Sequence, residues 1–94
     1  MKNYTAITAQ TKLATLKNWT FINDGITKTY VFTNFSEALA FIIQVGLIAE
    51  KLNHHPDWTN SYNKVFIRLT TYDSGGVTDK DFELALEIDK LIKD

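Results

Sequence analysis

The residue types best suited to proton transfer lie close together between residues 50 and 58. Both histidines of the chain, His54 and His55, stand side by side directly before Pro56, its only proline. Glu50 comes four residues before His54, which is one turn back on the same face if the segment is helical. An imidazole has an ordinary pKa of about 6.5, so it can give or take a proton near neutral pH. The segment therefore predicts a local site of carboxylate and imidazole groups.

The position of the two histidines also has a purely structural interpretation. Successive side chains diverge by about 100° in a helix and 180° in a strand, so only a pocket at the end of an element can gather both rings. Pro56 disfavours the α conformation at His55, which predicts that a helix ends near here. A histidine at a helix C-terminus is favoured by the macrodipole, and a proline just beyond a helix is common. The motif alone leaves both interpretations open.

Composition narrows the classes of protein to consider. We expect residues 1–94 to form one domain, with ten basic and eleven acidic residues and no cysteine. Disulfides and thiolate metal sites are excluded, and two adjacent histidines with few carboxylates make a poor zinc site. The near-neutral charge without a basic block argues against nucleic-acid binding. No apolar segment follows the start, and the run 38–49 is broken by Gln44, so we expect no signal peptide, no membrane span and a cytoplasmic location.

The first half of the chain predicts a helix and a hairpin. Residues 6–17 read as a short amphipathic helix, although its threonines weaken the propensity. Residues 19–22 and 26–32 read as strands, joined by a turn at 23–25 in which Asp-Gly would supply positive φ angles. Neither face of the second strand is cleanly apolar, so its orientation stays open.

A long helix is expected from Ser36, a plausible N-cap, to about Asn53. Apolar residues at helical spacing predict its core face: Ala38, Phe41, Ile42, Val45, Ala49 and Leu52. A further apolar set lies beyond that face: Leu39, Ile43, Leu47 and Ile48. An apolar excess of this kind favours a subunit interface.

The second half predicts two strands and a last helix. Residues 58–62 form a short candidate strand, and residues 64–72 alternate cleanly, with the face that carries Val65 and Ile67 turned to the helices. After a loop at 73–76, Thr78 is expected to cap the final helix, with Asp81 as the capping-box acid. The order α-β-β-α-β-β-α predicts an α+β two-layer domain.

With these elements in place, the chain resembles the pterin-4a-carbinolamine dehydratase family. The motif that carries the resemblance is an acid, His-His-Pro, two aromatic positions and a final Asp: Glu50, His54-His55-Pro56, Tyr62, Tyr72 and Asp81. The flanks resemble the family as well, including Trp19, Phe32, Phe35, Tyr62-Asn63-Lys64-Val65 and Gly75-Gly76-Val77-Thr78. The resemblance covers nearly the whole chain.

The resemblance implies a four-stranded antiparallel sheet with three helices on one face. It implies dehydration of 4a-hydroxytetrahydrobiopterin to the quinonoid dihydropterin, without metal or organic cofactor, which recycles the pterin of aromatic amino-acid hydroxylases. It also implies a homodimer or homotetramer through edge strands and the second helix. Some members have a protein partner, a homeodomain transcription factor.

The resemblance also implies roles for individual residues. His54 would be the principal acid/base group, and His55 would bind and polarise the pterin. Glu50 and Asp81 would orient these rings, although Asp81 could equally be only a helix cap. Trp58 would wall the pocket, or would be no more than a half-buried aromatic residue.

Tyr72 departs from the family pattern, which mostly has histidine there. A phenol, with a pKa near 10, accepts a proton poorly at neutral pH but can donate a hydrogen bond or stack on a pterin. Tyr72 would therefore face the pocket in place of the histidine, or would simply close its strand. The departure leaves an alternative function open, that of a weakly active or non-catalytic pterin-binding and protein-partnering module.

Overall fold

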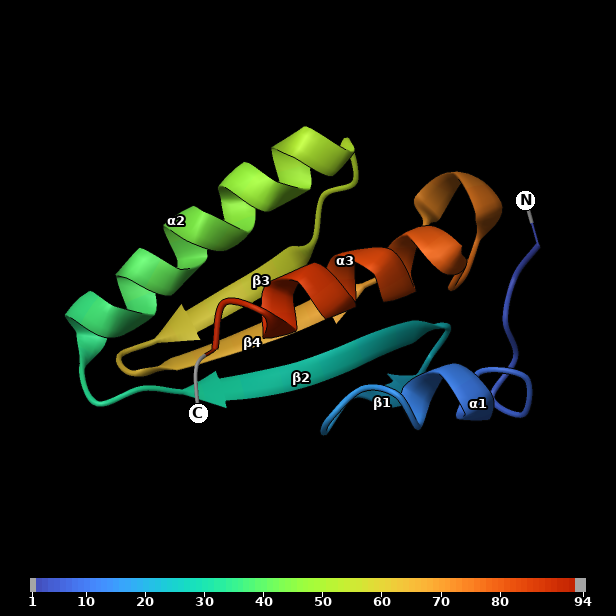
Figure 1. Ribbon diagram of the computed structural model, residues 1–94, viewed down its shortest axis with the longest axis horizontal. Helices are drawn as coiled ribbons and strands as arrows, with labels where there is room; N and C mark the ends of the chain where they lie inside the picture. The colour runs from blue at the N-terminus through green and yellow to red at the C-terminus, as the bar shows by residue number, and fades with distance from the viewer. Residues whose placement is uncertain (1, 93–94) are drawn as a thin grey trace.

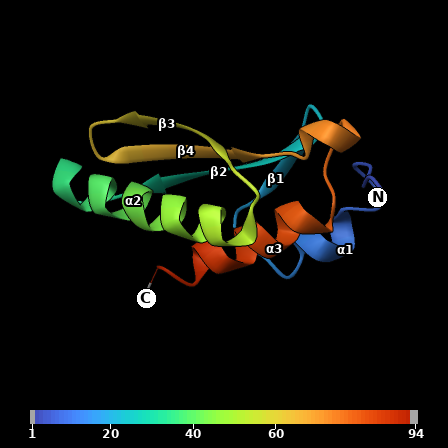
Figure 2. The same cartoon turned by 90° about the horizontal axis from the view of Figure 1, so that it is seen from above.

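The computed structural model describes residues 2–92, which form an antiparallel sheet with helices on one face (Figure 1). In chain order the elements are α1 (Gln10–Leu13), β1 (Thr20–Ile22), β2 (Gly25–Val31), α2 (Phe35–Leu52), β3 (Asp57–Ser61), β4 (Lys64–Leu69), the 3-10 turn η1 (Tyr72–Ser74) and α3 (Asp79–Asp89). The four strands lie in the order β1-β2-β4-β3. Figure 2 shows all three α-helices on the same side of the sheet. The predicted α+β class and element order are confirmed.

The core lies between the sheet and the helices. Burial alternates along β4, where Val65, Ile67 and Leu69 are buried and Lys64 and Phe66 are exposed. These side chains meet the buried stripes of the two long helices: Ala38, Phe41, Val45 and Ala49 from α2, and Phe82, Leu84, Ala85 and Ile88 from α3. The predicted core face of α2 and the inward face of β4 are therefore confirmed.

Hydrogen bonds to Asp89 explain which face of β2 points to the helices. Ile26 and Tyr30 are buried, so Lys28 faces the helices with them. Asp89 at the end of α3 accepts hydrogen bonds from Lys28 Nζ at 2.8 Å and from the Tyr30 hydroxyl at 2.5 Å, and from the indole N–H of Trp19 at 2.9 Å. Burial, followed by the bond to Asp89, raises the pKa of Tyr30 above its ordinary value. A charged residue is tolerated on this face because its partner lies opposite.

The β1–β2 hairpin is confirmed, but its turn lies one residue earlier than predicted. Positive φ angles occur at Asn23 (50°) and Asp24 (57°), while Gly25 pairs with Ile22 as part of the ladder. Asparagine and aspartate tolerate the left-handed region, as a type I′ turn requires at both central positions. Gly25 instead leaves room for the guanidinium group of Arg68, because a Cβ there would lie 2.1 Å from Nη1 of Arg68.

The first helix is much shorter than predicted, because threonine side chains take up backbone hydrogen bonds around it. Regular helix covers only Gln10–Leu13, with turns on both sides. The backbone N–H groups of Thr5 and Thr8 donate to each other's hydroxyl oxygens, and the Thr15 hydroxyl donates to the carbonyl of Lys12. Such local bonds compete with helix extension.

The start of α2 also differs from prediction. The N-cap is Asn34, whose side chain accepts from the backbone N–H of Glu37 at 2.9 Å, and Ser36 lies inside the first turn. The Glu37 carboxylate in turn accepts from the N–H of Thr33 at 3.0 Å. Asn34 caps the helix because its short side-chain acceptor stands three residues before Glu37, and the Glu37 carboxylate satisfies the N–H of the residue before the cap.

Both strands of the β3–β4 hairpin end earlier than predicted. β3 begins at Asp57 and ends at Ser61, because Tyr62 adopts a positive φ of 51° in the connecting turn. β4 ends at Leu69, and Tyr72 opens the 3-10 turn η1 rather than closing the strand. Gly75, with φ of 75°, ends this turn. Tyr72 thereby leaves the sheet and reaches the end of the molecule where α2 stops.

Candidate active site

A cavity of about 370 Å³ opens where α2, β3 and η1 meet. It is lined by residues from these elements and from the start of α3: Asn53, His54, His55, Pro56, Asp57, Thr70, Thr71, Tyr72, Asp73 and Lys80. A larger cleft of about 500 Å³ between β2 and α2 contains no histidine, and the carboxylate of Glu37 in it serves the helix start. The chemistry of the lining therefore places the candidate active site in the smaller cavity.

The end of α2 delivers His54 to this cavity. Asn53 adopts a left-handed conformation with φ of 53°, and its N–H donates to the carbonyl of Glu50. The N–H of His54 donates back to the carbonyl of Ala49 at 3.0 Å. This pair of bonds is a Schellman motif, which satisfies the last helix carbonyls and reverses the chain. The predicted helix end before Pro56 is confirmed.

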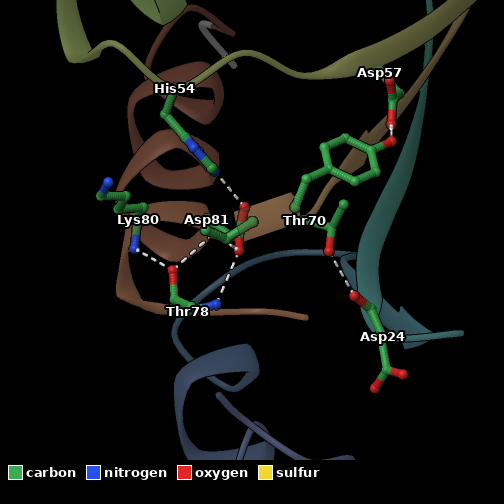
Figure 3. Close-up of polar contacts among 9 residues, drawn as sticks. Asp24, His54, Asp57, Thr70, Thr78, Lys80 and Asp81 are labelled. Carbon is green, nitrogen blue, oxygen red and sulfur yellow. Dashed lines mark hydrogen bonds and ion pairs between the residues drawn. The ribbon is translucent and has the colours of Figure 1, made fainter. Parts of the chain in front are cut away.

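His54 is bonded to a buried carboxylate. Its Nε2 lies 2.5 Å from Oδ1 of Asp81, which is fully buried, and the side chain of His54 is 11% exposed (Figure 3). Oδ2 of Asp81 accepts from the Thr71 hydroxyl and from the backbone N–H of Thr78, both at 2.9 Å. A carboxylate can only accept, so Nε2 of His54 carries the proton and Nδ1 is the free basic atom of the neutral ring.

Asp81 belongs both to the start of α3 and to the site. The capping box of Thr78 and Asp81 is complete, as predicted, and the same carboxylate holds His54. The sequence left two alternatives for Asp81, a helix cap or a residue of the site. In the structure Asp81 both caps α3 and contacts His54. Every buried side-chain polar atom in residues 2–92 has a hydrogen-bond partner, so this network is fully satisfied.

His55 pairs with Glu50 at the surface. Its Nε2 lies 2.8 Å from Oε1 of Glu50, and both side chains are largely exposed. The sequence placed Glu50 beside His54 by helical spacing. That pairing is wrong, because the chain leaves the helix at Asn53 and carries His54 away from the face of Glu50.

Tyr72 lines the cavity and donates its phenolic proton to Oδ2 of Asp57 (Figure 3 marks this contact at Asp57). The hydrogen bond to Asp57 is the main reason that the pKa of Tyr72 is raised above its ordinary value, and the positive charge of Arg68 acts in the opposite direction. Of the two alternatives for Tyr72, a position at the pocket is therefore the one found.

Trp58 is not among the residues that line the cavity, so of its two alternatives the partly buried aromatic residue is the one found. Its Cα pairs with Ile67 of β4, which directs the side chain to the helix side of the sheet. There its ring approaches Gly46 of α2, where a Cβ would stand 3.5 Å from the ring. The alternation of side chains along β3 explains the difference, since Asp57 and Trp58 must point to opposite faces.

Several lining residues were missed from the sequence. Asp57, Thr71 and Lys80 carry no motif of their own, and the bond between Asp57 and Tyr72 spans fifteen residues. The register of the β3–β4 hairpin brings the two together, since Asp57 pairs with Arg68 near the end of β4. A correct strand register is the signal that could have identified Asp57.

Two further properties concern only the part of the chain that the structure describes. Residues 2–92 contain no group of three or more histidine, cysteine, aspartate or glutamate side chains arranged to hold a metal ion. None of their helices is long and apolar enough to cross a membrane.

Similar proteins agree with this fold and with the family resemblance. The family model described as "Pterin 4 alpha carbinolamine dehydratase" matches residues 2–91. Two relatives bear the name "Putative pterin-4-alpha-carbinolamine dehydratase": one from Prochlorococcus marinus is 53% identical over 80% of this chain and 79% of its own length, and one from Sulfurisphaera tokodaii is 45% identical over 98% and 99%. The crystal structure of a "transcriptional coactivator/pterin dehydratase" from Brucella melitensis has a TM-score of 0.93 and 34% identity, and covers 98% of this chain and all of that one.

The fold and the cavity define a small α+β protein in which imidazole and phenol groups are each paired with a carboxylate. The chain belongs to the pterin 4 alpha carbinolamine dehydratase family, a family of hydro-lyases. The family resemblance inferred from the His-His-Pro motif and its flanks is confirmed.

Proposed function

We propose that the protein dehydrates 4a-hydroxytetrahydrobiopterin to the quinonoid dihydropterin and water, and so recycles the pterin of aromatic amino-acid hydroxylases. The observation that carries the proposal is the bond between His54 and the buried carboxylate of Asp81 at the edge of the cavity. The family membership supports the same reaction class. The proposal assigns no metal or organic cofactor.

His54 is the principal acid/base group in this proposal. The reaction needs one proton delivered to the departing hydroxyl group and one proton removed from a ring nitrogen, so the products are the quinonoid pterin and water. Asp81 fixes Nε2–H of His54 and leaves Nδ1 free to exchange a proton with the pterin. His55, oriented by Glu50, binds and polarises the pterin, and Tyr72, which also lines the cavity, contacts it as well.

The test is turnover of synthetic 4a-hydroxytetrahydropterin by the purified protein, followed by absorbance against the uncatalysed rate. His54→Ala is expected to lose a factor of about 10² to 10⁴, the usual contribution of one acid/base group. The fold should persist, which circular dichroism checks. A folded His54→Ala variant with full turnover would contradict the assignment. Turnover should survive a chelator, since no cofactor is assigned.

Self-association is the second part of the proposal. Leu39, Ile43 and Leu47 project from α2 away from the core and are 43%, 55% and 68% exposed. The strand β3 lies at the edge of the sheet, so one of its sides has no strand paired with it, and all of its residues are exposed. We infer a homodimer or homotetramer formed through these two surfaces. A protein partner, as the name of the Brucella melitensis relative suggests for that protein, would use the same surfaces.

A further inference from the structure

The phenol at the cavity is held in the same way as the two imidazoles, by a carboxylate of its own. Tyr72 donates to Asp57, a residue to which neither the motif nor the family resemblance gives a role. The contact joins the start of β3 to the start of η1 at the rim of the cavity, and both residues contribute to its lining.

We propose that Asp57 is a positioning residue that fixes the polarity of Tyr72, so that Tyr72 accepts a hydrogen bond from an N–H group of the bound pterin instead of donating one. The inference rests on the proposed function, because it takes a pterin as the ligand. It reverses the role expected for a tyrosine that replaces histidine as a donor.

The inference follows from the single proton that the Tyr72 hydroxyl can donate. A phenol has a single O–H donor, while an ionised carboxylate has none and can only accept. The bond to Asp57 therefore uses the only proton of Tyr72, and the hydroxyl oxygen has just its lone pairs to offer to the cavity. A pterin carries ring and amino N–H groups that can donate to such an oxygen. Without Asp57, the same hydroxyl could turn and donate to a pterin carbonyl.

Burial does not hold the ring in place. Tyr72 is 71% exposed and Asp57 is exposed too, so the hydrogen bond is the contact that restricts the phenol. Asp57 is itself well fixed, because it follows Pro56 and pairs with Arg68 in the ladder. The charged and titratable groups around Tyr72 are Asp57 and Arg68 on the strands, and His54, His55, Asp73 and Lys80 in the cavity lining.

A double-mutant cycle separates positioning from direct contact with the ligand. KM and kcat are measured for the wild type, Asp57→Ala, Tyr72→Phe and the double variant, together with the Kd of oxidised biopterin as a non-reacting probe. Asp57→Ala should raise KM and Kd about 2- to 12-fold, the value of one neutral hydrogen bond, with little change in kcat. In the Tyr72→Phe background the same substitution should have no further effect.

A titration of the phenol tests the contact without any ligand. The difference in phenolate absorbance between the wild type and Tyr72→Phe isolates the ionisation of Tyr72. In Asp57→Ala this ionisation should move to lower pH, toward the ordinary value of about 10, since the negative partner no longer opposes the phenolate. Glu83→Gln removes one charge from an exposed site on α3 and should leave the Tyr72 curve unchanged.

Two results would overturn the inference: a Tyr72 ionisation that Asp57→Ala does not move, or an equal rise of KM in the wild-type and Tyr72→Phe backgrounds. A wild-type protein that neither binds biopterin nor turns over the carbinolamine would overturn the proposed function, and this inference with it. The titration would then still report whether Asp57 holds Tyr72, so the two failures are distinguishable.

Discussion

At the scale of residues, Asp81 links the stability of the fold to the site. One oxygen receives His54, and the other receives the Thr71 hydroxyl and the Thr78 N–H that starts α3. The carboxylate accepts these three donors through both of its oxygens, whereas the amide of asparagine has only one accepting oxygen. The orientation of His54 and the start of α3 therefore depend on the same buried side chain.

Asp81→Asn should lower both stability and turnover. The amide presents a donor where the carboxylate accepted, which leaves a buried group unpaired at a cost of about 1–3 kcal/mol. Turnover should fall about 10- to 100-fold, because the ring of His54 loses its charged partner. Urea unfolding and steady-state rates measure the two effects. Thr78→Ala is the matched control: it should cost about 0.5–2 kcal/mol as a lost cap but largely keep turnover. Equal losses of turnover in both variants would contradict a site role for Asp81.

Tyr72 can be tested by restoring the residue type that the family mostly has. Tyr72→His should raise turnover and add a dependence on pH near the imidazole pKa of about 6.5, with the rate increasing as the ring loses its proton. Tyr72→Phe should weaken pterin binding by about 0.5–1.5 kcal/mol. Rates and affinities are compared across the pH range on both sides of that pKa. If both variants match the wild type, Tyr72 has no part in the site.

At the scale of elements, hydrophobic periodicity predicted the helices and strands, and local hydrogen bonds decided where they end. The stripes of α2 and α3 and the alternation of β4 are set by burial, which repeats along the sequence. The ends differ because each depends on one competing side chain, such as Asn34 instead of Ser36 at the start of α2. Apolar patterns contain no information on that choice.

The start of α2 provides a direct comparison between the predicted and the observed cap. Asn34→Ala should destabilise the protein by about 0.5–2 kcal/mol, because the N–H of Glu37 loses its acceptor. Ser36→Ala, inside the first turn, should change stability by no more than a few tenths of a kcal/mol. The free energy of unfolding in urea measures both. A larger effect at Ser36 than at Asn34 would show that the cap is assigned to the wrong residue.

The site was predictable as far as neighbouring residues define it. His54, His55 and Asp81 were found from a motif whose parts are fixed by a helix end and a capping box. Two of the pairings were not: Glu50 reaches His55 only after the Schellman turn, and Asp57 reaches Tyr72 only through the hairpin register. The spacing of residues along the sequence cannot predict contacts that depend on how the strands and turns are arranged in the fold.

At the scale of the whole molecule, α2 has more apolar surface than one domain uses. Its core stripe packs on the sheet, and its outer face exposes Leu39, Ile43 and Leu47 along three successive turns. A contiguous apolar stripe on an outer helix face is typical of association between subunits. The cavity of the candidate site lies at the C-terminal end of the same helix, so an assembly through α2 would bring the candidate sites of several subunits together.

Ile43→Glu should therefore reduce the size of the particle in solution. Ile43 lies at the centre of the exposed stripe, where association would bury a carboxylate without a partner. Light scattering coupled to size exclusion gives the mass of the wild type and of the variant at the same concentration. Gln44→Glu adds the same charge at the next residue, on the flank of the helix, and should leave the mass unchanged. Circular dichroism checks that both variants keep their helices. A wild-type protein that remains monomeric at high concentration would contradict association through α2.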